Sequence, residues 1–143
     1  MIEVYNDEFF MRQALIEAKK AFDKNEVPVG AVVVLQNRVI ARGHNLTEQL
    51  SDVTAHAEIQ AITSAAQFIG AKYLKGCTMY VTLEPCAMCA GALFWSKIDK
   101  VVYATRDKKR GAGQHETPIY HPSSLVVKGP LQEESQQLSL IHI

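Results

Sequence analysis

"YVTLEPCAMCAGAL", residues 80–93, joins an apolar strand directly to a helix and places two cysteines at the junction. The segment "TMYVTL" (78–83) is typical of a buried strand, and "CAMCAGALFWSKI" (86–98) predicts the helix that follows it. Pro85 suits the entry to a helix. In sheets covered by helices, ligands bind where strands end and helices begin. Cys86 and Cys89 therefore occupy a position suited to chemistry.

The flanking segments continue the alternation of strands and helices. They predict a first helix from Asn6 or Asp7 to near Asn25, a strand at 27–35, a turn at 36–38, a hairpin strand at 39–44, a helix at 55–69, a strand at 100–105 and a weak last strand at 124–127. This order implies right-handed crossovers that place helices on both faces of a sheet. We therefore expect an α/β fold with three αβα layers and a central mixed sheet of about five strands.

The composition is that of an ordinary globular chain. Its 143 residues are 48% hydrophobic and 21% charged, which predicts a single domain over residues 1–143. No apolar run is long enough for a membrane span, and "MIEVYNDEFF" lacks the features of a secretory signal, so we expect a cytoplasmic protein. Fifteen basic residues balance fifteen acidic ones, so any attraction to nucleic acid must come from local charge.

A third potential metal ligand, His56 in "TAHAEI", begins the helix that follows the hairpin. One imidazole and two thiolates are a ligand set characteristic of Zn²⁺, and three protein ligands leave the fourth position for water. Zinc makes hydroxide available near neutral pH, and Glu58 is the natural proton shuttle. Residues two apart do not share a face of a regular helix, so the first turn must be oriented for both His56 and Glu58 to reach the site.

Other interpretations of these residues stay open. A C-x-x-C pair can also be a redox couple, and the presence of His56 and Glu58 is what argues for a metal site instead. Cys77 can supply a fourth ligand and close the site, giving a non-catalytic zinc-binding module. However, Cys77 precedes the strand and lies roughly 20 Å from its carboxyl end, which favours a buried apolar role.

The motifs "HAE" (56–58) and "PCAMC" (85–89) resemble the zinc-dependent cytidine and deoxycytidylate deaminases. With "EVPVGAVVV" (26–34), "HN" (44–45) and "RDKKRGA" (106–112), the chain is most similar to the bacterial tRNA-specific adenosine deaminases. The resemblance implies a cytidine deaminase-like fold, zinc ligation by His56, Cys86 and Cys89, proton transfer by Glu58, and adenosine-to-inosine conversion at the tRNA wobble position. It also implies that Asn45 holds the base, although "HN" alone favours a turn.

The choice of substrate rests on weaker patterns. An RNA-binding edge is suggested by Lys97, Lys100, Arg106, Lys108, Lys109 and Arg110, and the same run is also typical of a solvated surface. By the resemblance Asp107 lies near the nucleotide, and otherwise it is a loop carboxylate. After Lys128 the sequence has no Lys or Arg and no Phe, Trp or Tyr. A free base or nucleoside (guanine, cytosine or adenosine) therefore remains an alternative to a tRNA anticodon stem-loop.

The resemblance also implies a homodimer. The apolar segment "AGALFWSKI" (90–98) contains Phe94 and Trp95, which can form such an interface. Packing of the same residues into the core of one chain explains the pattern equally well.

Overall fold

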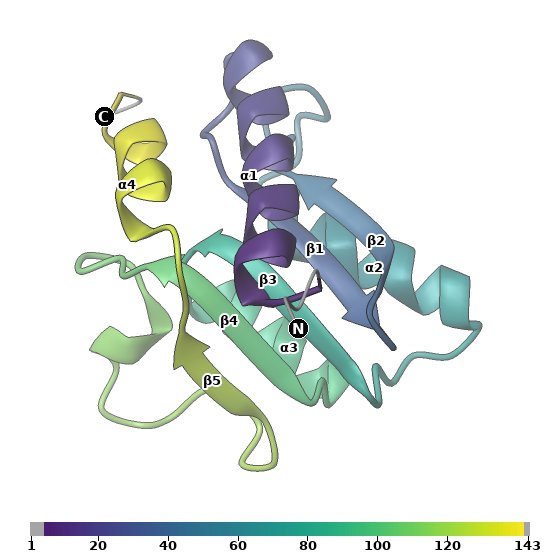
Figure 1. Ribbon diagram of the computed structural model, residues 1–143. Coiled ribbons are helices and arrows are strands. Elements are labelled where there is room, and N and C mark those ends of the chain that lie inside the picture. The colour runs from purple at the N-terminus through teal and green to yellow at the C-terminus, as the bar shows by residue number, and fades with distance from the viewer. Residues whose placement is uncertain (1–4, 142–143) are drawn as a thin grey trace.

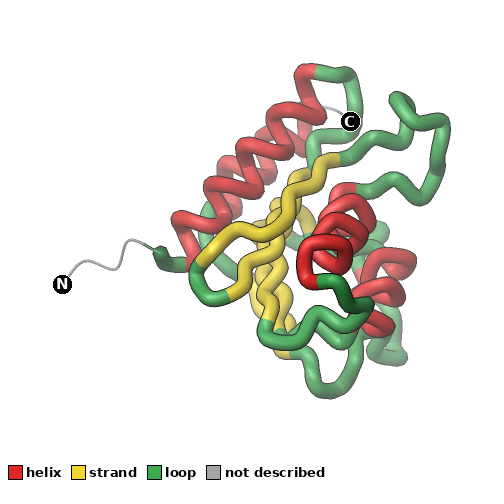
Figure 2. The backbone as a smooth tube through the Cα atoms, turned by 90° about the vertical axis from the view of Figure 1, so that its right-hand side faces the viewer, coloured by secondary structure: helices red, strands yellow, loops and turns green. Residues whose placement is uncertain are grey.

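The computed structural model describes residues 5–141, which form a sheet between two layers of helices (Figures 1 and 2). Helices α1 and α4 cover one face, and α2 and α3 cover the other. The helices are α1 (Asp7–Asp23), α2 (Ala57–Ile69), α3 (Ala87–Ser96) and α4 (Gln132–Ile141), with a short 3₁₀ turn at Ala112–Gln114. The strands are β1 (Gly30–Leu35), β2 (Arg38–His44), β3 (Cys77–Leu83), β4 (Lys100–Thr105) and β5 (Leu125–Lys128). The predicted three-layer α/β fold is confirmed.

The five strands follow the order β2-β1-β3-β4-β5. Strand β1 pairs antiparallel with both β2 and β3, whereas β3, β4 and β5 run parallel. Gln36 and Asn37 connect β1 to β2 with φ angles of 50° and 62°, as a two-residue hairpin turn with the twist of the sheet requires. The sheet is therefore mixed, as the sequence predicts, and its parallel half ends beside the cysteine motif.

Both faces of β1, β3 and β4 are buried, and successive side chains of each strand point to opposite faces. Val33, Met79 and Val101 point toward α2 and α3, while Val32, Tyr80 and Val102 point toward α1. Burying one such aliphatic side chain contributes about 1.5–3 kcal/mol. The sandwich therefore stabilises β3 and β4 from both sides and fixes where these two strands end.

A glycine sets the distance between α2 and the sheet. A Cβ at Gly43 would overlap the carbonyl oxygen of Ala57 and lie 2.7 Å from the backbone nitrogen of Ala61. The first turn of α2 therefore rests directly on the backbone of β2. This contact places the amino terminus of α2, with His56 and Glu58, beside the end of the hairpin.

Helix α4 is the main element that the sequence pattern does not predict. It packs against β3, β4 and α1, and Ser135 on its inner face is buried. Within residues 5–141, none of the helices combines the length and the apolar character needed to cross a membrane.

Candidate metal centre and active-site pocket

The amino terminus of α2 carries two of the predicted site residues. His56 is the N-cap residue and has an extended backbone (φ −74°, ψ 157°), so its side chain does not follow the helical period. Glu58 is the second residue of the helix itself. Both side chains line one pocket. This is possible because Glu58 follows the helical period whereas His56, outside the helix, does not. The orientation that the sequence requires of this first turn is thus achieved by the cap.

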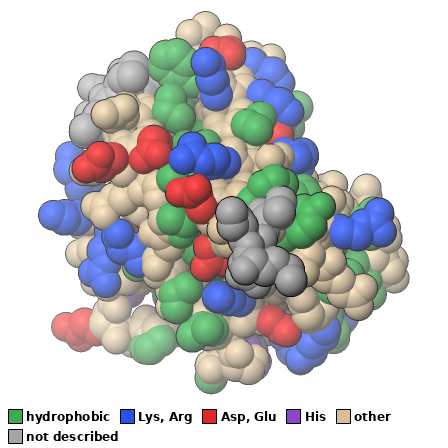
Figure 3. Space-filling view, in the orientation of Figure 1, with side chains coloured by type: hydrophobic (Ala, Val, Ile, Leu, Met, Phe, Trp, Pro, Cys, Tyr) green, Lys and Arg blue, Asp and Glu red, His purple; other side chains and the backbone are tan. Residues whose placement is uncertain are grey.

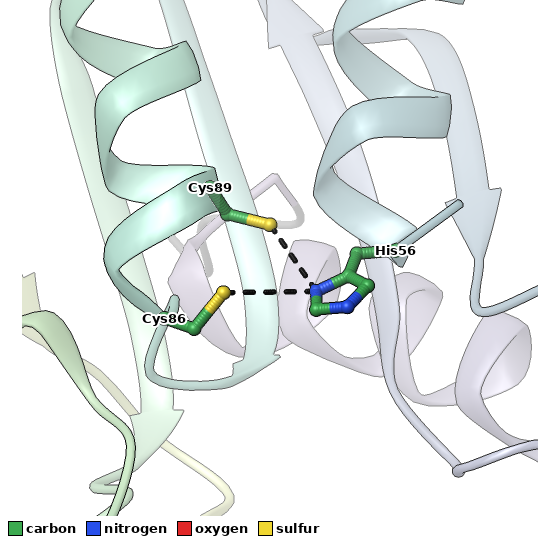
Figure 4. A group of neighbouring side chains, drawn as sticks. All are labelled: His56, Cys86 and Cys89. Carbon is green, nitrogen blue, oxygen red and sulfur yellow. Dashed lines mark hydrogen bonds between the residues drawn. The ribbon is translucent and has the colours of Figure 1, made fainter. Parts of the chain in front are cut away.

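The amino terminus of α3 supplies the two thiols opposite. Cys86 is its N-cap residue (φ −74°, ψ 175°), and Cys89 lies one turn later. Figure 4 shows both sulfur atoms directed at the imidazole of His56. The Nδ1 atom of His56 lies 3.7 Å from Sγ of Cys86 and 3.5 Å from Sγ of Cys89. Two helix amino termini, whose dipoles favour thiolates, thus meet at one point.

These distances fit zinc. Zn–S bonds of about 2.3 Å and Zn–N bonds of about 2.0–2.1 Å at tetrahedral angles place sulfur and nitrogen about 3.6 Å apart. Among residues 5–141, His56, Cys86 and Cys89 form the group of three or more His, Cys, Asp or Glu side chains whose ligand atoms all lie within 4.8 Å of one another. The donor set and its spacing therefore match the predicted zinc cofactor, with one tetrahedral position left for a further ligand.

Hydrogen bonds link the three candidate ligand side chains to one another. Hydrogen bonds from Cys89 and His56 lower the pKa of Cys86 to about 4. The hydrogen bond to Cys86, together with burial, raises the pKa of Cys89. The thiolate form of Cys86 is thus favoured, and the thiolate is the form that binds a metal ion.

Cys77 lies at the first residue of β3, buried, at the end of the strand away from the site. Its Sγ atom donates a long hydrogen bond (3.8 Å) to the carbonyl oxygen of Lys75. The strand spans six residue steps to Leu83, or about 20 Å. Cys77 is therefore not placed to close the metal centre.

A pocket of about 190 Å³ opens beside the metal centre. This volume is below the roughly 300–1,000 Å³ of drug-sized ligand sites and suits one flat ring system. Its wall consists of Val27, Val29, Asn45, Thr47, His56, Ala57, Glu58, Leu83, Glu84, Cys86, Asp107 and Arg110. Burial raises the pKa of Glu58 to about 7. A proton-carrying group thus lies in an apolar slot next to the metal ligands.

The loop that closes one side of the pocket is held by a second buried carboxylate. Glu84 accepts hydrogen bonds from the backbone N–H groups of Asp107 (3.1 Å) and Gly113 (2.9 Å). A Cβ at Gly111 would overlap an oxygen of Glu84, so glycine is required there for close approach. Asp107 itself accepts from the N–H groups of Lys109 and Arg110, so its carboxylate shapes the loop as well as lining the pocket.

The fold separates the basic residues that the sequence groups together. Lys97 ends α3 and lies over the ring of Tyr73 (4.6 Å), and Lys100 begins β4. The other four, Arg106, Lys108, Lys109 and Arg110, follow the carboxyl end of β4 beside the pocket. Because β4 has six residues, its two ends are about 17 Å apart. Only the second group borders the candidate site.

Sequence reasoning missed two acidic residues that shape this pocket, Glu26 and Glu84. Glu84 follows a buried strand and directly precedes Pro85. A charged residue at a strand end, next to a metal-ligand motif, indicates a residue of the site. Glu26 lies between α1 and β1 and is fully buried. No local pattern marks it, because its partners come from the segment after β2.

The sequence matches the family model described as the cytidine and deoxycytidylate deaminase zinc-binding region over residues 4–105. Proteins known as tRNA-specific adenosine deaminase are similar to it. The one from Aquifex aeolicus is 53% identical over 73% of this chain and 69% of that protein. The one from Bacillus subtilis is 46% identical over 90% of this chain and 83% of that protein.

Solved structures of deaminases are also similar to this chain. One, from a study of A-to-I editing by tRNA:A34 deaminases at the wobble position of transfer RNA, has a TM-score of 0.86 and 43% identity and covers 92% of this chain and 99% of its own. A guanine deaminase from Bacillus subtilis has a TM-score of 0.68 and 28% identity and covers 95% of this chain and 93% of its own. The zinc-binding description of the family model agrees with the donor set of His56, Cys86 and Cys89. The chain therefore belongs to the cytidine and deoxycytidylate deaminase family, and among its relatives there are the tRNA-specific adenosine deaminases.

Proposed function

We propose that this chain is a cytoplasmic zinc-dependent deaminase that converts adenosine to inosine at the wobble position of tRNA. The observation that carries the proposal is the position of Glu58, which is 4% exposed and lines the same small pocket as the ligands His56 and Cys86. A structural zinc site has four protein ligands and needs no acid at its side. A three-ligand site with a buried carboxyl group is suited to hydrolysis.

The residues of the chain divide the reaction between them. His56, Cys86 and Cys89 would hold a zinc ion, which would supply Lewis acidity and lower the pKa of a water molecule to about 7. Glu58 takes a proton from the attacking water, gives it to the adenine ring, and then passes a proton to the departing amine. The new C6–O bond replaces the C6–N bond, so that one water is consumed and one ammonia leaves.

The pocket walls orient the base. Val27, Val29 and Leu83 provide apolar surface, and the amide of Asn45 provides polar contacts. Asn45 is 6% exposed, and its backbone N–H donates to the carbonyl oxygen of Val29 (3.2 Å), so its position is fixed by the residue that directly precedes β1. A slot for one base requires that an RNA substrate turn its target nucleotide out of the stack.

A second groove supports an RNA substrate over a free nucleoside. This groove, of about 380 Å³, lies between the loop after β4 and helix α4 and shares Leu83 and Asp107 with the catalytic pocket. Its basic side chains are Arg106, Lys108, Lys109 and Lys128, against the single carboxylate of Asp107. Figure 3 shows acidic and basic side chains interspersed over the face of α1 and α4. The proposed attraction for phosphate is therefore local.

Replacing both Lys108 and Lys109 by alanine should lower kcat/KM for an anticodon stem-loop. It should also reduce the slope of log kcat/KM against log salt concentration by roughly 1 per lysine, because each phosphate contact releases counterions. The matched control is Lys97→Ala with Lys100→Ala, which removes equal charge at the other end of β4. Equal salt dependence in the two double variants would contradict an RNA contact at this groove.

We further propose that the protein is a homodimer. Met88 and Trp95 lie two turns apart on one face of α3, and Trp95 is 74% exposed. A large exposed apolar stripe on a helix is typical of an interface. Sedimentation equilibrium should give twice the mass of 15.9 kDa, and Trp95→Glu should give the monomer mass.

The function is tested with zinc-loaded protein, an adenosine-wobble anticodon stem-loop, and a panel of free bases and nucleosides. Ammonia release and inosine formation are measured for each, with Glu58→Ala as the blank. Turnover of the stem-loop in preference to the panel is the expected result. Turnover of a free base or nucleoside alone would replace tRNA with a small-molecule substrate, and no turnover of any would overturn the proposal.

A further inference from the structure

Glu26 is a buried carboxylate that lies behind the pocket without lining it. It is 0% exposed, in the segment between α1 and β1, and within residues 5–141 no cationic side chain lies at ion-pair distance from it. A desolvated carboxylate destabilises a fold unless its oxygens accept hydrogen bonds. The partners of Glu26 therefore indicate why it is there.

Glu26 accepts four hydrogen bonds, all from the segment that follows β2. The backbone N–H of Gln49 donates to Oε2 (2.8 Å), and that of Glu48 donates to Oε1 (3.1 Å). The same Oε1 receives Nδ2 of Asn45 and the hydroxyl of Thr47, both at 3.4 Å. Two of the four donors are side chains that line the catalytic pocket.

The contacts of Glu26 fix which group of the Asn45 side chain faces it. A carboxylate oxygen can only accept, so the end of the Asn45 amide that faces Glu26 must be the NH₂ group. Thr47 repeats this constraint, because its hydroxyl donates to Glu26 and accepts from Nδ2 of Asn45 (3.3 Å). Without these contacts, a 180° rotation of the Asn45 amide would exchange the positions of its oxygen and its nitrogen, which are nearly equal in size. The hydrogen-bonding pattern that Asn45 shows to a base would then be reversed.

We propose that Glu26 is a positioning residue that fixes the hydrogen-bonding polarity of Asn45 and thereby the choice of base. This inference rests on the proposed function, in which Asn45 contacts the base. It assigns to Glu26 an effect on substrate binding and base preference, with no contact to the reacting atoms.

Glu26→Gln is the sharpest test, because it keeps the volume and removes the acceptor-only character. The new amide has one oxygen, so its NH₂ group must face either the backbone N–H of Gln49 or the three donors that share Oε1, one of which is Asn45. In either orientation a backbone N–H of the segment that carries Asn45 and Thr47 faces a donor, so the fixed orientation of the Asn45 amide is lost. We expect KM for the stem-loop to rise about tenfold with a smaller change in kcat, since a mismatched buried hydrogen bond weakens binding by about that factor.

A double-mutant cycle separates positioning from general loop damage. If Glu26 acts through Asn45, Glu26→Gln should change KM by less than about twofold in an Asn45→Ala background. Multiplication of the two single effects would overturn the proposal. Thr47→Val, which removes one arm of the same constraint without burying a new group, should raise KM about threefold and provides the test if Glu26→Gln does not fold.

Glu17→Gln is the matched control, since Glu17 is also buried (3% exposed) and lies on α1. Its partners are Lys20, Arg42 and His44, none of which lines the pocket. It should lower the melting temperature and leave KM within about twofold. An active wild type whose KM is equally insensitive to Glu26→Gln overturns this inference alone, whereas a wild type with no turnover overturns the proposed function and this inference with it.

Discussion

Replacing Glu58 by alanine should lower kcat by about 10²–10⁴-fold while the protein keeps its zinc. Glu58 is buried at the start of α2 beside the ligands, and in the proposed reaction the same carboxyl group handles each proton transfer. Its loss leaves the pocket with neither the proton acceptor nor the proton donor. Single-turnover measurements of inosine formation give the rate, and metal analysis of the same sample gives the zinc content.

Glu58→Gln is the control for shape. It keeps the volume of the side chain and its contacts with the pocket wall but cannot carry a proton at neutral pH, so it should be as slow as the alanine variant. Turnover within tenfold of wild type in either zinc-loaded variant would remove Glu58 from the mechanism.

Cys89→Ala should release the zinc and abolish activity. Cys89 is fully buried, and its Sγ atom lies 3.5 Å from Nδ1 of His56. A water molecule therefore replaces this ligand less easily than it would replace an exposed one. Two remaining protein ligands hold the ion far more weakly than three. The variant should also melt at a lower temperature than wild type, and the difference should shrink when both are treated with a chelator, because only wild type then loses a bound ion.

Cys77→Ala is the matched thiol control. Cys77 is as buried as Cys89 but lies at the far end of β3, so its replacement should reduce stability by about 1 kcal/mol and leave one zinc per chain. Loss of the ion from Cys77→Ala would restore the closed, four-ligand interpretation. Retention of zinc and activity by Cys89→Ala would contradict the ligand set itself.

Local sequence patterns predict the order of most strands and helices. The helix at Asp7–Asp23 begins at the Asn6 cap, and the strands at 30–35, 77–83 and 100–105 fall within a few residues of their predicted limits. Local patterns do not predict helix α4, because "QEESQQLSL" (132–140) has too few apolar residues to show a helical period. It forms where Ser135 and its neighbours meet β3, β4 and α1, a contact that no local pattern announces.

The candidate zinc ligands are predictable for the same reason. Cys86 and Cys89 are one turn apart at a strand-to-helix junction, and His56 stands at the equivalent junction of the preceding crossover. Spacing along the chain and the chemistry of thiolate and imidazole are local properties. They indicate the metal and the class of reaction without any knowledge of how far apart the two junctions lie.

Other features depend on contacts between distant segments. The extended N-cap backbone of His56 lets it reach the site together with Glu58, and the length of β4 divides the basic run into a group beside the pocket and a group at its far end. Glu26 and Glu84 gain their roles from backbone N–H groups 22 to 29 residues away. A buried carboxylate is defined by what surrounds it, and packing brings those surroundings together only when the whole sheet has formed.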